Sequence, residues 1–204
     1  IHVAENGFYA GYLVLADTVK AEAPHAVKEL RELGVGRIFL LSGDLEGPTV
    51  DVEKRLSLDG SFWGLLPEEK VALLEEMQTA NPGKGVSAFV GDGLNDAPVI
   101  ARAGVGISMG KVGSDITVDN ADVVIMNDHL SGLPEALRIA RKTRGVIWQN
   151  ILLSLAVKAA VLALGAFGAA TLWEAVFADV GMTLLAVINS SRILRWSRRQ
   201  RAAA

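Results

Sequence analysis

Apolar positions in the first 130 residues alternate between short β-branched runs and stretches with helical spacing, and Gly, Pro or Asp separates these segments. Such alternation is typical of a parallel α/β domain. The opening residues flank Asn6-Gly7, a dipeptide that tolerates positive φ, so an antiparallel hairpin is expected there. Hairpin strands are predicted at 1–4 and 8–16, further strands at 37–41, 86–90, 105–107 and 123–126, and helices at 23–33, 48–56 and 67–80.

Beyond residue 133 the pattern changes to long apolar sequence that is compatible with helices. The segments 151–170 and 175–193 are each long enough to cross a hydrocarbon core of about 30 Å at a rise of about 1.5 Å per residue. Lys158 is the only charged residue of the first segment, and Asp179 is the only acid of the second. The polar residues 171–174 separate these two segments, so the sequence predicts two membrane-spanning helices joined by a short loop. The alternative is a helical hairpin buried in a soluble core.

Charge changes sign near the same point. Residues 1–137 carry 10 Lys and Arg against 21 Asp and Glu, a net charge of −11, whereas residues 138–204 carry 10 against 2, a net charge of +8. Basic residues flank both outer ends of the expected hairpin and are absent from its loop, so the positive-inside rule predicts that both ends are cytoplasmic. We interpret the basic tail as a topology signal and a lipid contact rather than a nucleic-acid surface.

Composition removes other classes of protein. Half of the residues are hydrophobic, which excludes a disordered chain. The chain contains no Cys, so disulfides, thiolate metal sites and Cys nucleophiles are excluded within it.

The strongest chemical signal is the octet Gly91-Asp92-Gly93-Leu94-Asn95-Asp96-Ala97-Pro98, which follows the apolar strand 86–90. In a parallel sheet, ligands bind at the carboxyl ends of the strands. Two carboxylates four residues apart, Asp92 and Asp96, suit Mg²⁺, which takes one or two protein carboxylates and completes its octahedron with water and phosphate oxygens. The alternative is an Asp-Gly turn with an Asp as a helix N-cap.

Two further segments complete a candidate site for phosphoryl transfer. Ser42-Gly43-Asp44 follows the strand 37–41 and offers a hydroxyl and backbone N–H groups to a phosphoryl group, although the same tripeptide is common in turns. Lys70 lies one turn into the helix that Pro67 opens, where by itself it has the pattern of a solvated residue. Together these groups predict a site that acts through positioning and electrostatics, and they lack a nucleophile.

These motifs resemble the phosphorylation domain of P-type ATPases, which has the haloacid-dehalogenase fold, a Rossmann-like α/β fold. Ser replaces the family's Thr at position 42, and Leu45 stands where many relatives have Asn. The resemblance implies that Ser42, Gly43 and Asp44 match the T-G-D motif and that Lys70 matches the phosphate-stabilising lysine. It further implies that Asp92 is the Mg²⁺ ligand and that Asn95 and Asp96 are the polar pair that supports this site. Asp17 matches an acid that follows a strand of the domain.

The family's D-K-T-G-T motif, which supplies the phosphorylated aspartate, occurs nowhere in the 204 residues. The resemblance therefore implies the C-terminal portion of a pump, inactive alone, whose partners are its own actuator and nucleotide-binding domains, its earlier transmembrane helices and the lipid membrane. On this interpretation residues 1–133 are the C-terminal part of the phosphorylation domain. Residues 134–204 are a stalk helix, the last two transmembrane helices and a basic cytoplasmic tail.

Asn150, Lys158 and Asp179-Val180-Gly181 resemble the pattern N, seven residues, K, then D-x-G in the heavy-metal subgroup that exports Zn²⁺, Cd²⁺ and Pb²⁺. The resemblance implies that Asp179 ligates the transported ion and that Lys158 is its counter-charge. A carboxylate suits borderline Zn²⁺ better than soft Cu⁺. We therefore expect a multi-pass pump of a prokaryotic plasma membrane that uses ATP and Mg²⁺. The alternatives are a P-type ATPase for Cu⁺ or K⁺, and a membrane-anchored haloacid-dehalogenase phosphatase or non-catalytic module.

Overall fold

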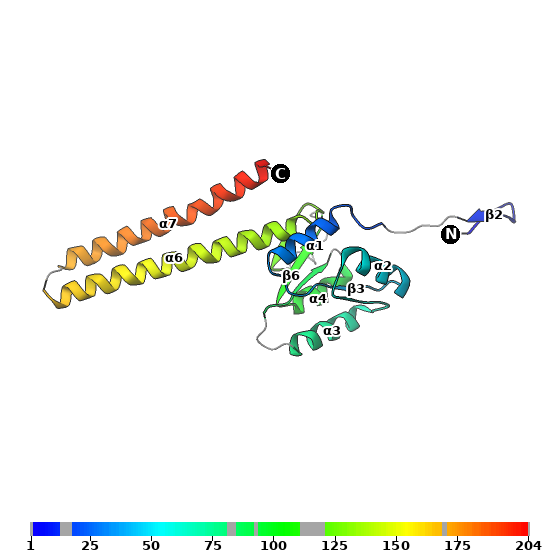
Figure 1. Ribbon diagram of the computed structural model, residues 1–204, viewed down its shortest axis with the longest axis horizontal. Coiled ribbons are helices and arrows are strands. Elements are labelled where there is room, and N and C mark those ends of the chain that lie inside the picture. The colour runs from blue at the N-terminus through cyan, green and yellow to red at the C-terminus, as the bar shows by residue number, and fades with distance from the viewer. Residues whose placement is uncertain are drawn as a thin grey trace. The chain divides into compact units, whose positions relative to one another are not determined.

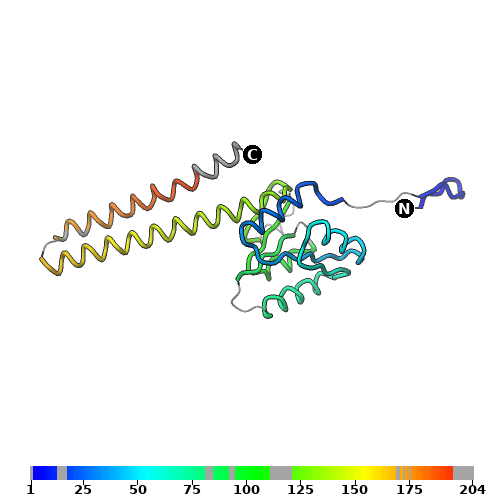
Figure 2. Tube along the Cα trace, viewed as in Figure 1, coloured from blue at the N-terminus to red at the C-terminus, as the bar shows by residue number. Residues whose placement is uncertain are grey.

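The structure, a computed structural model, describes residues 2–12, 18–80, 85–91, 94–110, 121–168 and 171–203 (Figures 1 and 2). The chain divides into two compact units, Ile1–Leu133 and Pro134–Ala204. In the first unit strands alternate with helices, and the second unit consists of two long helices.

The first unit has the α/β composition that the sequence predicts. Its strands are β1 (His2–Glu5), β2 (Phe8–Tyr12), β3 (Phe39–Leu41), β4 (Gly60–Phe62), β5 (Ala88–Gly91), β6 (Val105–Met109) and β7 (Val123–Ile125). Its helices are α1 (Ala23–Glu32), α2 (Glu46–Leu56), α3 (Pro67–Thr79), the 3₁₀ turn η1 (Leu94–Asp96) and α4 (Ala97–Arg102).

The N-terminal hairpin is confirmed. Strands β1 and β2 pair antiparallel, and the turn between them uses Asn6 at φ 51° and Gly7 at φ 82°, as expected for this dipeptide. The described part of the second strand ends at Tyr12, so the predicted continuation through residue 16, and Asp17 after it, lie outside the described residues.

The other strands are parallel. β3 pairs with β4, and β5, β6 and β7 form a three-stranded sheet in that order. Within the described ranges, β3 and β5 are not paired with each other. In Figure 1, α1 and α3 lie on opposite sides of these strands. The two loops that carry the predicted site residues leave the carboxyl ends of these strands, one after Leu41 of β3 and the other after Gly91 of β5.

The core of this unit lies where α4 packs on the three-stranded sheet. Val99 and Ile100 of α4 are fully buried, and α4 contacts both β5 and β6. At Gly106 of β6 the backbone passes so close to α4 that a Cβ atom would lie 2.5 Å from the carbonyl oxygen of Ile100. A side chain at position 106 is therefore incompatible with this packing.

Asp59 connects α1 to the strands β3 and β4. Its carboxylate accepts hydrogen bonds from the backbone N–H of Ile38 at 2.7 Å and from the Arg31 guanidinium at 2.9 Å. These two donors favour the ionised form, so they hold the pKa of the Asp59 carboxyl below its ordinary value.

Three elements were not predicted: β4, the 3₁₀ turn η1 and α4. β4 has only three residues, Gly60-Ser61-Phe62, which are too few to display a period, and parallel pairing with β3 makes this segment a strand. α4 has six residues and begins at Ala97, within the octet, whose glycines indicate a loop. Burial against the sheet stabilises α4, and local helix propensity does not identify it.

The second unit is an antiparallel pair of long helices, α6 (Gly132–Ala166) and α7 (Leu172–Ala203) (Figure 2). Both contain segments long and apolar enough to cross a membrane, Gly132–Ala166 and Val176–Leu194. α6 ends four residues before the predicted end of the first span at residue 170, and Gly168 then adopts φ 72°. α7 begins three residues before the predicted second span, because the Glu174 carboxylate accepts the backbone N–H of Thr171 and caps the helix.

Candidate functional site

Lys70 and Asp96 form an ion pair at the carboxyl end of β5. The Lys70 Nζ lies 2.9 Å from Asp96 Oδ1, and the two side chains are only 15% and 16% exposed. Lys70 comes from the first turn of α3, whose start is fixed by Pro67 and by a hydrogen bond from Leu66 N–H to the Glu69 carboxylate at 2.8 Å. The structure thus unites two site residues that are 26 positions apart in the sequence.

Asp96 also lies directly against the end of the strand. A Cβ atom on Gly91 would lie 2.7 Å from Asp96 Cβ, so only glycine at position 91 allows this approach. Asp96 precedes α4, yet its side chain makes no capping hydrogen bond to that helix. Asp96 therefore occupies the N-cap position of α4, while its carboxylate pairs with Lys70.

Ser42, Gly43 and Asp44 form a tight turn after β3. The Ser42 hydroxyl donates to Asp44 Oδ2 at 2.9 Å and accepts the Asp44 N–H at 3.1 Å. The turn packs against the loop that leaves β4, because Leu65 N–H donates to the Ser42 carbonyl at 3.0 Å and Gly64 N–H donates to the Asp44 carbonyl at 2.9 Å. In this geometry the hydroxyl proton points at Asp44 and must turn away from it before it can reach a phosphoryl oxygen.

The loop after β4 joins these two groups. Leu65 contacts Ser42, and α3 with Lys70 begins two residues later. Asn95 is exposed on η1, next to Asp96. Asp92 and Asp17 lie outside the described residues, so their positions in this site stay predictions.

The donors at this edge are hard oxygens, as Mg²⁺ requires. Across the described ranges there is no group of three or more His, Asp or Glu that could hold a metal ion. Mg²⁺ takes only one or two protein carboxylates, and the rest of its shell is water and phosphate oxygen. The Asp96 carboxylate beside Gly91, which is 16% exposed, therefore fits a Mg²⁺ site, and Asp92 as its second carboxylate stays a prediction.

A second ion pair crosses the helical hairpin. The Lys158 Nζ of α6 lies 3.0 Å from Asp179 Oδ1 of α7, and the two side chains are 57% and 66% exposed on the surface of this pair of helices. Ionised groups at membrane depth are costly and pair with one another or line a functional path. The structure therefore brings together the two charges that the sequence places in the spans.

A polar cluster on the same hairpin joins Asn150, which belongs to the N, seven residues, K pattern, to two residues outside that pattern, Asn189 and Ser190. Asn150 of α6 is hydrogen-bonded to Asn189 and Ser190 of α7. A detectable signal exists in the sequence, because Asn189 lies at helical spacing from Met182 and Ala186 in an otherwise apolar stretch.

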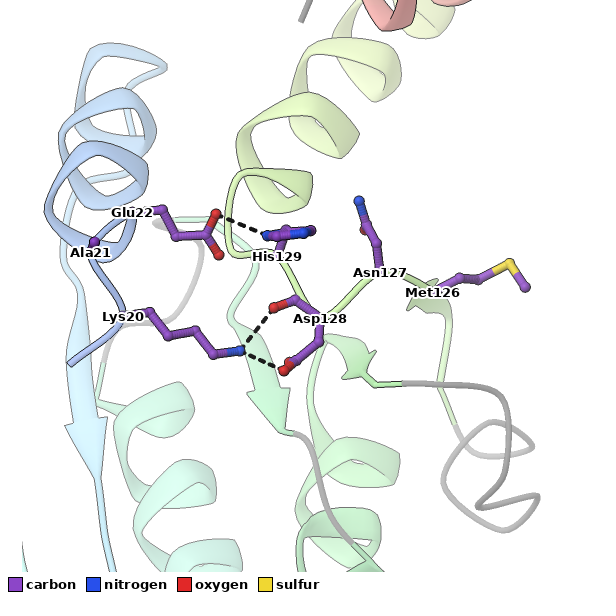
Figure 3. Close-up of a pocket in the computed structure, with 7 residues that line it drawn as sticks. All are labelled: Lys20, Ala21, Glu22, Met126, Asn127, Asp128 and His129. Carbon is purple, nitrogen blue, oxygen red and sulfur yellow. Dashed lines mark hydrogen bonds and ion pairs between the residues drawn. The ribbon is translucent and has the colours of Figure 1, made fainter. Parts of the chain in front are cut away.

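A cavity lies elsewhere in the first unit, at the start of α1 (Figure 3). It measures about 650 Å³ and is lined by Lys20, Ala21, Glu22, Met126, Asn127, Asp128 and His129. Two pairs cross it: Lys20 Nζ lies 2.7 Å from the Asp128 carboxylate, and His129 Nδ1 lies 3.2 Å from that of Glu22. These contacts hold the start of α1 to the segment after β7. Among the predicted site residues that the structure describes, none lines the cavity.

Comparison with known proteins gives a family match over the first unit. Residues 2–104 match the family described as haloacid dehalogenase-like hydrolase. A zinc-transporting ATPase of Synechocystis sp. is 50% identical over 195 residues, which cover 96% of this chain and 27% of that protein. A cadmium, zinc and cobalt-transporting ATPase of Bacillus subtilis is 47% identical over 96% of this chain and 28% of its own length.

A solved structure agrees with the sequence relatives. The crystal structure of a zinc-transporting PIB-type ATPase in an E2.Pi state matches 95% of this chain with a TM-score of 0.81 and 37% identity, and the match covers 31% of that protein. The chain thus spans little more than a quarter of the length of the curated relatives that it matches.

Proposed function

Because the chain belongs to the haloacid dehalogenase-like hydrolase family, we propose that it supplies the phosphoryl-transfer domain and a metal-binding membrane hairpin to an ATP-driven pump. The cargo is Zn²⁺, Cd²⁺ or Pb²⁺, exported from the cytoplasm. The rest of the pump supplies the nucleotide-binding and actuator domains, the earlier transmembrane helices and the aspartate that is phosphorylated. Similarity to zinc- and cadmium-transporting ATPases over 96% of the chain supports this proposal.

The contact between Lys158 and Asp179 carries the assignment of the cargo. The two charges lie 3.0 Å apart on two span-length helices, where an isolated charge would be costly. A carboxylate oxygen is an acceptable ligand for Zn²⁺ and a poor one for Cu⁺. The pair therefore favours a divalent metal over Cu⁺.

Asp179 binds the cation through the oxygen that now contacts Lys158. A divalent ion and the Lys158 ammonium compete for this carboxylate, since both need it to offset their charge. Entry of the ion displaces the ammonium, and return of the ammonium to Asp179 favours release of the ion. Lys158 thus serves as a counter-charge that keeps the empty site neutral.

The first unit promotes phosphoryl transfer by positioning charge. Lys70 places an ammonium at the carboxyl end of β5, where it offsets the charge of the phosphoryl oxygens. The Ser42 hydroxyl turns from Asp44 to donate to the same group. When bound, Mg²⁺ would be held by Asp92 and Asp96 and would neutralise charge on the transferred phosphoryl group.

The hairpin lies in the membrane, and both of its outer ends face the cytoplasm together with the phosphorylation domain. Basic residues beyond residue 191 and between residues 138 and 144 support this orientation, because positive charge concentrates on the cytoplasmic side.

The test is metal-dependent ATP hydrolysis by the full-length protein in lipid, with Zn²⁺, Cd²⁺, Pb²⁺, Cu⁺ and K⁺ compared. We expect stimulation by the first three ions and its loss in Asp179→Ala. Glu174→Gln is the matched control, because Glu174 is the other acid of residues 138–204 and the amide oxygen of Gln can still accept the Thr171 N–H at the start of α7. Stimulation by Cu⁺ or K⁺, or an Asp179→Ala variant that responds like the parent, would overturn the proposal.

A further inference from the structure

The two helices of the hairpin meet along a seam of partly or fully buried positions spaced three and four residues apart. On α6 these positions are Thr143, Val146, Asn150, Ser154, Val157 and Val161; on α7 they are Ala178, Met182, Ala186, Asn189 and Ile193. Most of them are apolar or small. Apolar contacts within lipid discriminate weakly between one register and the next, because lipid tails are as apolar as the side chains.

Asn150 and Asn189 are the two amide side chains on this seam. Asn189 Nδ2 donates to Asn150 Oδ1 at 2.8 Å, and Asn150 Nδ2 donates to Ser190 Oγ at 3.1 Å. Asn150 thus uses both its acceptor and its donor across the interface. Hydrogen bonds of this kind are directional, and a shift of one helix along the other breaks both.

This cluster and the Lys158–Asp179 pair require the same register. Lys158 lies eight residues beyond Asn150, about 12 Å along α6, and Asp179 lies ten residues before Asn189, about 15 Å along α7. Because the helices are antiparallel, both pairs meet in one alignment. A slip of one helical turn moves the helices by about 5.4 Å and separates Lys158 from Asp179, which now lie 3.0 Å apart.

We infer that Asn150, Asn189 and Ser190 are positioning residues that set the register of α6 against α7 and thereby hold Lys158 against Asp179. A single buried Asn fixes register in coiled coils by the same physics, since misaligned pairing leaves an amide without a partner. The effect of this register on transport rests on the proposed function, whereas the register itself does not.

Cysteine cross-linking of the chain in lipid vesicles measures the register directly, because the chain has no Cys of its own. The variant pair Val157→Cys with Met182→Cys lies between the two polar contacts and reports the observed alignment. The pairs Val157→Cys with Ala178→Cys and Val157→Cys with Ala186→Cys report slips of one turn in either direction. We expect the first pair to dominate in the parent chain.

Asn150→Leu is expected to lower the ratio of in-register to slipped cross-links by about threefold to tenfold, the range that an interhelical hydrogen bond in a membrane supports. Ser190→Ala removes one bond without added bulk and should shift the ratio in the same direction by less. Asn150→Gln, which keeps an amide, should restore much of the parental ratio. Ser191→Ala is the control, since Ser191 donates to Ile188 on its own helix, and it should change nothing.

An unchanged cross-linking ratio in both Asn150→Leu and Ser190→Ala would overturn the inference. In the full-length protein, Asn150→Leu should raise the Zn²⁺ concentration needed for half-maximal ATPase stimulation, and Asn150→Gln should reverse most of that increase. The two proposals fail separately. An Asp179→Ala variant that metal ions stimulate like the parent would overturn the metal site and leave the cross-links as they are, whereas unchanged cross-links in the Asn150 and Ser190 variants would overturn the role of Asn150 alone.

Discussion

Lys70 and Asp96 each keep less than a fifth of their side-chain surface in contact with water, so each depends on the other for compensation of its charge. Lys70→Met is therefore expected to lower phosphorylation of the full-length protein by about 100-fold, since it removes a preorganised charge from the phosphoryl group. Phosphoenzyme formation from labelled phosphate measures this effect.

Lys28→Met is the matched control for Lys70→Met. Lys28 is 74% exposed on α1, and its distance of 3.9 Å to Glu32 marks a weak surface pair. Phosphorylation should be unchanged in this variant. Equal phosphorylation in Lys70→Met and the parent would remove Lys70 from the site.

Asp59 makes the stability of the first unit depend on pH. The Ile38 N–H and the Arg31 guanidinium lower the pKa of the Asp59 carboxyl in the folded state. The ionised carboxylate therefore contributes fully to the free energy of unfolding above the unfolded-state pKa of about 3.9. This contribution is lost as the pH falls through the lower folded-state pKa. Asp59→Asn should lower the unfolding free energy by about 1 kcal/mol at neutral pH. Thermal unfolding from pH 7 to pH 3 should show a smaller acid-induced loss in this variant than in the parent, and parallel curves would contradict the assignment.

At the scale of elements, the contact between α4 and β6 leaves no room at Gly106. Gly106→Ala places a methyl group 2.5 Å from the Ile100 carbonyl oxygen and should lower the unfolding free energy by about 1–3 kcal/mol. Gly47→Ala on α2 is the control, because a Cβ atom there meets nothing within 4 Å and a helical Gly-to-Ala change stabilises by up to about 1 kcal/mol. Chemical denaturation of both variants should therefore give shifts of opposite sign.

The elements with a clear period or a strong terminator were predictable from the sequence. α3 begins at Pro67 as expected, and the Asn6-Gly7 turn forms its hairpin, because both signals are local. β4 and α4 were not predictable, since β4 depends on parallel pairing with β3 and α4 depends on burial against the sheet, and neither contact leaves a local signal in the sequence. The same distinction applies to the sites. Motifs identify Lys70 and Asp96 singly, but only the fold directs the Asp96 carboxylate to Lys70 instead of to the backbone N–H groups of α4.

The hairpin shows this distinction again. Charge and length predict the two spans, and the resemblance selects Lys158 and Asp179. Asn189 and Ser190 lie outside that pattern, and their bonds to Asn150 depend on an alignment of helices that no local signal specifies.

At the scale of the whole molecule, the parallel strands form two separate groups. Within the described ranges, β3 and β5 each pair with a neighbouring strand on one side only. The loops that follow them nevertheless carry motifs of the same predicted phosphoryl-transfer site. Unpaired edges leave backbone N–H and C=O groups without sheet partners. We therefore expect a longer chain that includes an upstream D-K-T-G-T strand to unfold at a higher temperature and in a sharper transition than the 204 residues alone, as calorimetry can measure. Equal transitions would mean that these edges need no further strand.

The contact between Lys158 and Asp179 has a consequence for how the protein is made. A single Lys or Asp at the centre of a helix opposes insertion by about 3 kcal/mol, so neither α6 nor α7 enters the bilayer with its charge unpaired without this penalty. Once the two charges lie 3.0 Å apart, the hairpin presents a neutral pair. With the proposed membrane placement, insertion of the two helices together as a pair is therefore expected to cost less free energy than insertion of α6 alone.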